Sequence, residues 1–170
     1  MNNAEKRKVL LNKCLSIISD NDRKIYAEIA EYAIELGYTP KAIKTASGVS
    51  DALTFTKSKV NRTLLKIRPN IEAGKSQLVM TFFATVDYSD IFKQGIRRVI
   101  EAFDGRYTGC YGCGRCKGKL QGYTYTYPDG KKVFRCGREL IELPAIKPEN
   151  VKEILTMLKV QDEFFMEQNI

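Results

Sequence analysis

The chain has 170 residues, of which 44% are hydrophobic and 28% charged, so a disordered or fibrous protein is excluded. The net charge of +8 is unevenly spread, because residues 41–135 alone carry 18 basic and 7 acidic side chains, a net charge of +11. All apolar runs are shorter than the roughly 20 residues of a membrane-spanning helix, so we expect a cytoplasmic protein without a membrane partner.

Two amphipathic helices are predicted at the N-terminus, as a helical hairpin over residues 1–38. Apolar residues recur at helical spacing from Leu10 to Ile18 and again from Ile25 to Leu36. Cys14 belongs to the first apolar stripe, so we expect it to be buried like a small hydrophobic residue. A short third helix is predicted next, because Thr39-Pro40 has the form of an N-cap followed by proline in the first helical position.

The spacing of apolar residues then changes, and residues 50–104 are predicted to form a sheet followed by a helix. Alternation with polar residues indicates consecutive strands around Leu53–Phe55, Leu65–Ile67 and Gln77–Val86. The connections suit hairpins and are too short for a helical crossover, so the strands are predicted to be antiparallel. Ser89-Asp90 is placed to begin an amphipathic helix.

Residues 107–143 are predicted to form a cysteine-rich hairpin region, and residues 147–168 a terminal helix. Tyrosine and threonine alternate from Tyr123 to Tyr127, and the turn-forming residues 128–130 lead into a second strand that ends at Cys136. The hairpin therefore returns Cys136 toward the cysteines that precede it.

Four cysteines have the spacing of a metal site: Cys110, Cys113, Cys116 and Cys136. Cysteines separated by two residues present two sulfurs to one ion, and the glycines beside them allow the backbone to turn closely around it. The chain has no histidine, so all four ligands are thiolates. A four-thiolate site has no open position for water, so we expect one structural zinc ion that orders a loop lacking an apolar stripe.

Two alternatives to zinc stay open. The same spacing also holds [4Fe–4S] clusters, although the proline that typically follows the last cysteine in bacterial ferredoxins is absent here. Metal-free thiols or disulfides are the other alternative, and a reducing compartment favours a metal over a disulfide framework. Within the zinc interpretation, Cys113, Cys116 and Cys136 with some fourth group other than Cys110 would also be chemically acceptable.

The predicted fold class is α+β in a single domain, 1–170, with an antiparallel β-sheet packed on helices, an N-terminal helical hairpin and a zinc-stapled β-hairpin near the C-terminus. The order of elements from Tyr26 to Met166, with the segment Tyr88–Phe92 opening a helix, resembles the YdhG-like domains of unknown function. That resemblance implies a compact frataxin-like α+β fold. It rests on layout, and the cysteine-rich hairpin departs from it as an insertion, so it implies no function.

Basic and aromatic side chains gather around the second hairpin as candidate contacts to an anion or nucleic acid: Arg115, Lys117, Lys119, Tyr123, Tyr125, Lys131, Lys132 and Arg135. Aromatic faces flanked by Lys and Arg can stack bases and neutralise phosphates. The alternation of tyrosine and threonine is equally typical of an ordinary half-buried strand, so both interpretations stay open.

A recognisable catalytic pattern is missing from the sequence. It has no histidine, no Walker A pattern and no G-x-G-x-x-G pattern. A non-enzymatic binding module for nucleic acid or another polyanion is therefore the favoured function. A small-molecule-binding or protein-interaction domain, an iron–sulfur protein using the same cysteines, and an enzyme with a lysine nucleophile stay open as alternatives.

Overall fold

The computed structural model of the chain describes residues 2–45, 48–72, 75–85, 87–102, 109–116, 119–143 and 145–168. Its helices are α1 (Asn3–Ile17), α2 (Asp20–Glu35), α3 (Asp90–Ala102) and α4 (Val151–Glu167), and a 3₁₀-helix, η1 (Pro148–Asn150), leads into α4. Its strands are β1 (Thr39–Thr45), β2 (Gly48–Lys57), β3 (Arg62–Glu72), β4 (Lys75–Met80), β5 (Gly122–Thr126), β6 (Lys132–Cys136) and β7 (Ile141–Glu142). None of the helices within these ranges is long and apolar enough to cross a membrane.

The strands form one large antiparallel sheet with the order β1-β2-β3-β4-β7 and a separate hairpin of β5 and β6. Leu53 pairs with Ile67 and Phe55 with Leu65, so the apolar members of the period-2 pattern share one face of the sheet. All four are fully buried. The α+β class and the antiparallel meander are therefore confirmed.

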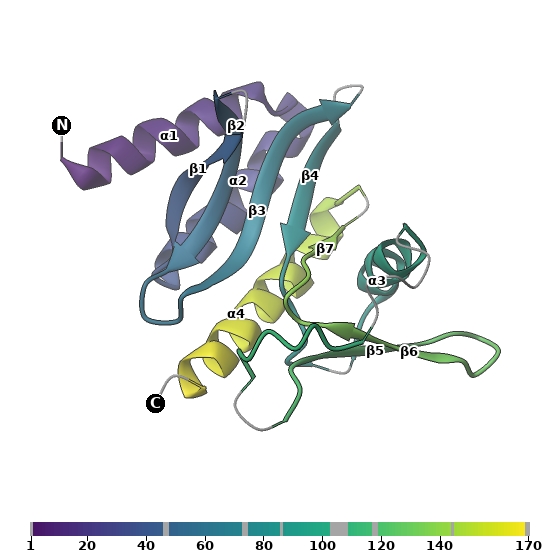
Figure 1. Cartoon of the computed structure of the whole chain (residues 1–170). Helices are drawn as coiled ribbons and strands as arrows, with labels where there is room; N and C mark the ends of the chain where they lie inside the picture. Colours follow the sequence, from purple (N-terminus) through teal and green to yellow (C-terminus); the bar gives the residue numbers. More distant parts are fainter. Residues whose placement is uncertain are drawn as a thin grey trace.

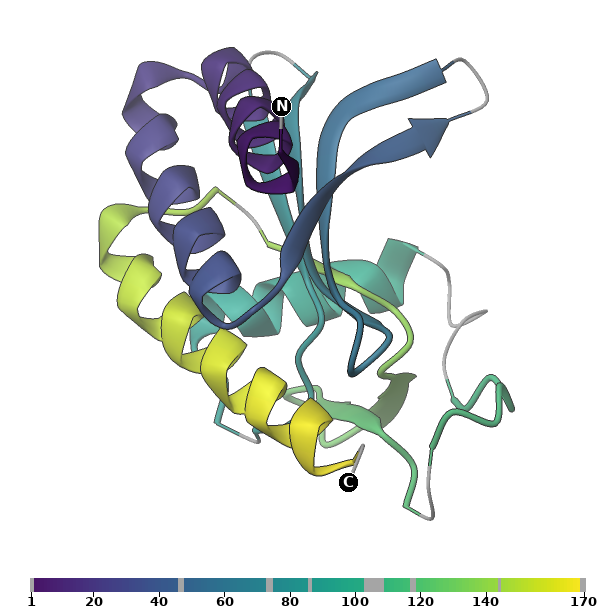
Figure 2. The ribbon, with the colours of Figure 1, turned by 90° about the vertical axis from the view of Figure 1, so that its left-hand side faces the viewer.

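Helices α1, α2 and α4 cover the same face of the large sheet, behind the strands in Figure 1 and to the left of them in Figure 2. The opposite face of β3 and β4 is turned toward the viewer in Figure 1. Helix α3 packs beside β7, where a Cβ atom at Gly95 would lie 2.8 Å from both the Glu142 carbonyl oxygen and Ile141 Cγ2. A glycine at this position therefore allows α3 to contact the strand backbone closely.

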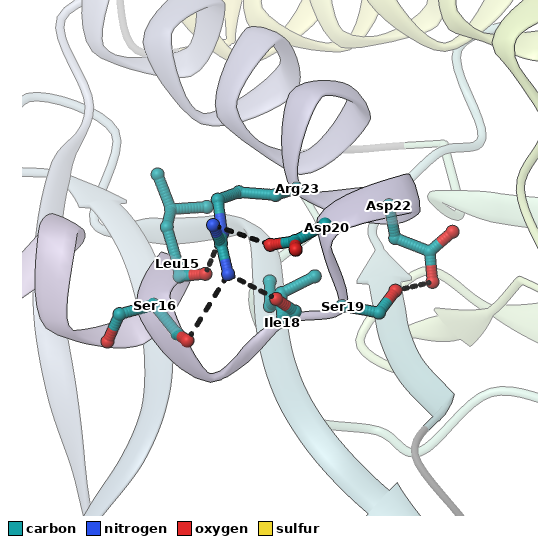
Figure 3. A network of polar contacts seen from close by, with 7 residues as sticks. All are labelled: Leu15, Ser16, Ile18, Ser19, Asp20, Asp22 and Arg23. Carbon is teal, nitrogen blue, oxygen red and sulfur yellow. Dashed lines mark hydrogen bonds and ion pairs between the residues drawn. The ribbon is translucent and has the colours of Figure 1, made fainter.

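The predicted N-terminal helical hairpin is present, and one arginine joins its two helices (Figure 3). The guanidinium of Arg23 in α2 donates to the carbonyl oxygens of Leu15 and Ile18, each at 3.0 Å, at the end of α1. It also lies 2.8 Å from the Asp20 carboxylate. Because the last carbonyls of a helix lack partners within the helix, this cation stabilises the end of α1.

Two predictions are wrong, one in the type of an element and one in its end. Thr39-Pro40 begins β1 instead of a third helix; β1 is an edge strand, where the missing N–H of proline is tolerated. The strand predicted over Gln77–Val86 ends at Met80. Beyond it, the Gln161 side-chain oxygen in α4 accepts hydrogen bonds from the backbone N–H groups of Phe83, at 2.8 Å, and Ala84, at 3.3 Å, so a side chain replaces a neighbouring strand.

Candidate metal centre and basic pocket

The predicted cysteine-bearing hairpin is formed by β5 and β6, which project beside α3 and away from the large sheet (Figure 1). Gly122 at its base pairs with Cys136, and the turn at its tip is closed by a hydrogen bond from Tyr127 N to Lys131 O of 2.8 Å. The base is anchored in the core, since the buried ring of Tyr123 stacks on Phe82 with ring centroids 6.1 Å apart.

Residues 109–116, named here the cysteine segment, lie on the side of the sheet opposite to α1, α2 and α4 (Figure 2). The segment joins the hairpin through a parallel bridge between Gly109 and Arg135, with a Gly109 N to Phe134 O hydrogen bond of 2.9 Å. Cys110 and Cys136 directly follow the two bridged residues. The bridge therefore brings the backbones of these two cysteines close together.

A second set of contacts links Cys116, through Gln121, to the residue that follows Cys136. The backbone N–H of Gln121 donates to Cys116 Sγ at 3.3 Å, and the Gln121 carbonyl oxygen accepts from Gly137 N at 2.9 Å. The Gly112 N–H donates to Cys110 Sγ, also at 3.3 Å.

An assembled metal centre is not seen. Among the described residues, which include all four predicted ligands, no group of three or more Cys, Asp or Glu side chains is placed to hold a metal ion. Cys110 is exposed, Cys113 and Cys116 are half-buried and Cys136 is buried, all as free thiols. The structural zinc ion and the zinc staple of the hairpin therefore stay predictions.

A cavity of about 460 Å³ lies between the open face of the large sheet and the cysteine segment together with residues 137–140, which follow β6. These two stretches are called the cysteine region below. We name the cavity the basic pocket, after the cations that line it: Arg62, Lys66, Arg68, Arg115 and Arg138. The first three come from β3, whereas Arg115 belongs to the cysteine segment and Arg138 follows β6. The carboxylates on the same wall are Glu139 and Glu142, so positive charge is in excess.

Hydrogen bonds orient two of the β3 cations. Arg62 Nη2 donates to the Arg115 carbonyl oxygen at 3.2 Å and to Gln121 Oε1 at 3.4 Å, and its guanidinium lies over the Phe165 ring, 5.9 Å from the centroid. Arg68 Nη1 donates to Gln77 Oε1 at 3.1 Å. These contacts leave the remaining donors of each guanidinium for a ligand, because the group carries five N–H donors.

The concentration of positive charge affects Lys66. Burial in the pocket lowers the pKa of its amine below the usual value, the neighbouring Arg68 cation lowers the pKa further, and Glu139 opposes both effects. An anion in the pocket would relieve this repulsion.

The candidate contact residues around the hairpin occupy different environments. Arg115 lines the basic pocket, Lys119, Lys131 and Lys132 are exposed, and Tyr125 is half-buried against Tyr127. Tyr123 and Arg135 are buried, at 3% and 0% exposure, so their side chains cannot reach a polyanion directly. Lys117 lies outside the described residues.

Lys66 and Arg68 were absent from the predicted contact set, although a signal for them exists in the sequence. Both alternate with the buried residues Leu65 and Ile67, which places them on the opposite face of β3. Two cations on the open face of one strand therefore indicate a basic surface. The proximity of that surface to the cysteine region depends on the tertiary structure alone.

Comparison with family models, curated proteins and solved structures finds no match for this chain. The resemblance to YdhG-like domains therefore stays a prediction.

Proposed function

We propose that this protein is a non-enzymatic binding module for nucleic acid or another polyanion, and that the basic pocket holds the phosphate groups of its ligand. The observation that carries this proposal is the convergence of five cations on one cavity from β3 and from the cysteine region. Convergence on a concave site is more specific than net charge alone, since charged side chains on an ordinary surface lie apart in solvent.

The side-chain types also favour phosphate. Four of the five cations are arginines, namely Arg62, Arg68, Arg115 and Arg138. The planar guanidinium presents paired donors that match two phosphate oxygens, whereas lysine acts as a point charge. Glu139 lies 3.7 Å from the buried Arg135 guanidinium, and this cation offsets part of the negative charge that Glu139 brings to the pocket.

We further propose that Cys110, Cys113, Cys116 and Cys136 bind one structural zinc ion. Support comes from the backbone contacts that link the Cys110 and Cys116 segments to the end of β6 at Cys136, and from N–H donors directed at two of the sulfurs. Gly112 and Gly114, on either side of Cys113, have φ values of +61° and +69°, which suits a tight turn around an ion. A [4Fe–4S] cluster on the same cysteines is the alternative.

The size of the cavity favours one further candidate. A volume of about 460 Å³ falls within the range of small-molecule sites, so a small phosphorylated compound is the second candidate ligand. The chemistry that recognises it would be the same, and only the length of the ligand separates the two candidates.

Fluorescence anisotropy with a labelled single-stranded oligonucleotide, measured across a salt series, tests the proposal. We expect affinity to fall steeply with salt, and Lys66→Ala to weaken binding about tenfold at low salt and to reduce the salt slope by about 0.7, the share of one phosphate contact. Lys152→Ala, an exposed lysine on α4, removes the same charge on the helical side and should change affinity by less than about twofold.

The outcomes separate the candidates. The same measurement is made with a mononucleotide. If the protein binds the mononucleotide at low salt but does not bind the oligonucleotide, the small-ligand function replaces the proposed one. Absence of binding to both probes would overturn the proposal.

Elemental analysis of anaerobically purified protein, together with its absorption spectrum, tests the metal. Zinc at one ion per chain with a colourless protein supports the structural site. Iron with visible absorption would replace zinc by a cluster.

A further inference from the structure

Two of the five cations of the basic pocket belong to the turns that carry the cysteines. Arg115 lies between Cys113 and Cys116, and Arg138 lies two residues after Cys136. Any ion that fixes the backbone of these turns also fixes the Cα positions from which the side chains of Arg115 and Arg138 extend. The geometry of the candidate metal site and that of the pocket are therefore coupled through short stretches of chain.

The contacts around Arg115 extend this coupling into the sheet. Arg62 of β3 donates to the Arg115 carbonyl oxygen and to the Gln121 side chain. The backbone N–H of that same Gln121 donates to Cys116 Sγ. A displacement of Cys116 would thus disturb the hydrogen-bond partners of Arg62, a third cation of the pocket.

The contacts around Arg138 lead back to the first cysteine. Its guanidinium lies 6.0 Å from the centroid of the Tyr111 ring, and Tyr111 follows Cys110 directly. The cysteine segment has no buried side chain of its own. Packing therefore contributes little to the order of the turns that hold Arg115 and Tyr111, and a bound metal ion would add to the few hydrogen bonds that hold them.

We propose that metal binding by the four cysteines controls the affinity of the basic pocket for phosphate-bearing ligands, by fixing Arg115 and Arg138 in their binding positions. This inference rests on the proposed function. Holding a long arginine side chain in place costs conformational entropy, and a metal that has already fixed the backbone lowers the share of that cost left to the ligand. The coupling is reciprocal, so the anion must also strengthen metal binding by the same factor.

The sign of the effect distinguishes ordering from simple electrostatics. When zinc replaces the protons of four thiols, the site changes from neutral to a net charge of about −2, since four thiolates outweigh one divalent ion. This added negative charge beside the pocket would by itself weaken anion binding. A gain in affinity on metal loading therefore has to come from the ordering of the arginines.

The experiment compares zinc-loaded protein with chelator-stripped protein, both full length, binding the same labelled single-stranded oligonucleotide over a salt series. We expect the stripped protein to bind at least tenfold more weakly. Its salt slope should be smaller by about 1.4, the share of two phosphate contacts on a single strand. Cys113→Ser should reproduce the loss, and Cys14→Ala, a buried cysteine outside the set, should not.

Two further measurements keep the inference falsifiable if Cys113→Ser fails to fold. Lys66→Ala should weaken binding by the same factor with and without zinc, because Lys66 lies on β3. Saturating oligonucleotide should slow zinc transfer to a chromogenic chelator. Equal affinity and equal slope in the two forms, or weaker binding by the zinc-loaded form, would overturn the inference and leave the proposed function intact. Absence of binding by the zinc-loaded form would instead overturn the proposed function.

Discussion

Helix α4 and the cysteine segment both contribute to the wall of the basic pocket, and they are held in opposite ways. Helix α4 buries seven side chains: Val151, Ile154, Met157, Leu158, Gln161, Asp162 and Phe165. The cysteine segment buries none of its eight residues, 109–116. One wall of the pocket is therefore positioned by packing, and the other depends on a few hydrogen bonds and, by our proposal, on a metal ion.

The buried polar groups of α4 strengthen this contrast. Lys57 Nζ of β2 lies 2.8 Å and 3.1 Å from the two carboxylate oxygens of Asp162, and it lies over the Tyr38 ring. The two charged side chains are only 15% and 11% exposed. Because water reaches neither charge well, separating the pair would leave each charge buried and unpaired. The pair therefore holds α4 to β2.

The largest expected effect comes from Asp162→Ala, which would leave the Lys57 ammonium group buried without its carboxylate. We expect a loss of about 3 kcal/mol in the free energy of unfolding, measured by urea denaturation. The pair Lys159–Glu163 on the same helix supplies the control, since its side chains are 60% and 58% exposed. Glu163→Ala should cost less than about 0.5 kcal/mol.

A smaller loss from Asp162→Ala, similar to that from Glu163→Ala, would show that the Lys57 pair behaves as a surface pair. Replacing both partners, as Lys57→Met with Asp162→Leu, should recover most of the stability, because the cost comes from the unpaired charge.

Removal of the metal should affect the cysteine segment and its contacts, and leave the packed region unchanged. On chelation we expect the backbone amides of Gly112 and Gln121 to exchange with solvent at least tenfold faster, a local effect of about 1.4 kcal/mol or more. Amides of β2 and β3 should keep their protection, since these strands are held by their buried apolar residues and by pairing with each other. Hydrogen exchange followed by mass spectrometry measures both regions in one sample. Equal loss of protection in β3 would contradict the contrast between the two regions.

The sequence was sufficient where one local pattern decides the structure. The helical stripes, the period-2 strands around Leu53–Phe55 and Leu65–Ile67, and the turn after Tyr127 are all found as predicted. Each depends on residues close together in the chain. Thr39-Pro40 was misassigned because the same two residues suit a helix start or an edge strand, and the pairing of Pro40 with Phe55 is a long-range choice.

The candidate site was only partly predictable, since burial depends on what packs above a strand. Tyr123 and Tyr125 share one face of β5 in the sequence pattern, yet Tyr123 stacks on Phe82 and is buried, whereas Tyr125 is half-buried. The basic pocket unites Arg62 and Arg115, 53 positions apart in the chain, through a hydrogen bond that no local pattern encodes. The cysteine spacing, in contrast, is a local pattern and identified the segment that borders the pocket.

A smaller effect is expected at the helical hairpin, which lies in the region held by packing. Arg23→Ala removes the donors to the Leu15 and Ile18 carbonyl oxygens. We expect a loss of about 1 kcal/mol in the free energy of unfolding, because these hydrogen bonds are charge-assisted but half-exposed. Lys24→Ala, an exposed neighbour on the same helix, is the control and should stay within about 0.5 kcal/mol of the parent. Equal effects of the two changes would remove Arg23 from the contacts that hold α1.

The smallest effect uses the fifth cysteine, which belongs to the packed region. Burial first, and the nearby Asp51 carboxylate second, raise the pKa of the Cys14 thiol to about 12, whereas an unfolded chain ionises this thiol near 9.0. Below pH 9 the thiol is neutral in both states and its contribution to stability is fully present. As pH rises, the unfolded state loses its proton first, so that contribution is lost between about pH 9 and pH 12.

Between pH 8 and pH 9.5 this single group should lower the free energy of unfolding by about 0.8 kcal/mol, and Cys14→Ala should remove that part of the decline. The difference between the two urea-denaturation series isolates Cys14, because every other ionisable residue is present in both proteins. In zinc-loaded protein the four ligand sulfurs should already be thiolates at pH 8, so one chain would hold cysteines of two kinds. Parallel pH curves for parent and variant would mean that Cys14 ionises in the folded protein as readily as in the unfolded chain, and would place it outside the packed region.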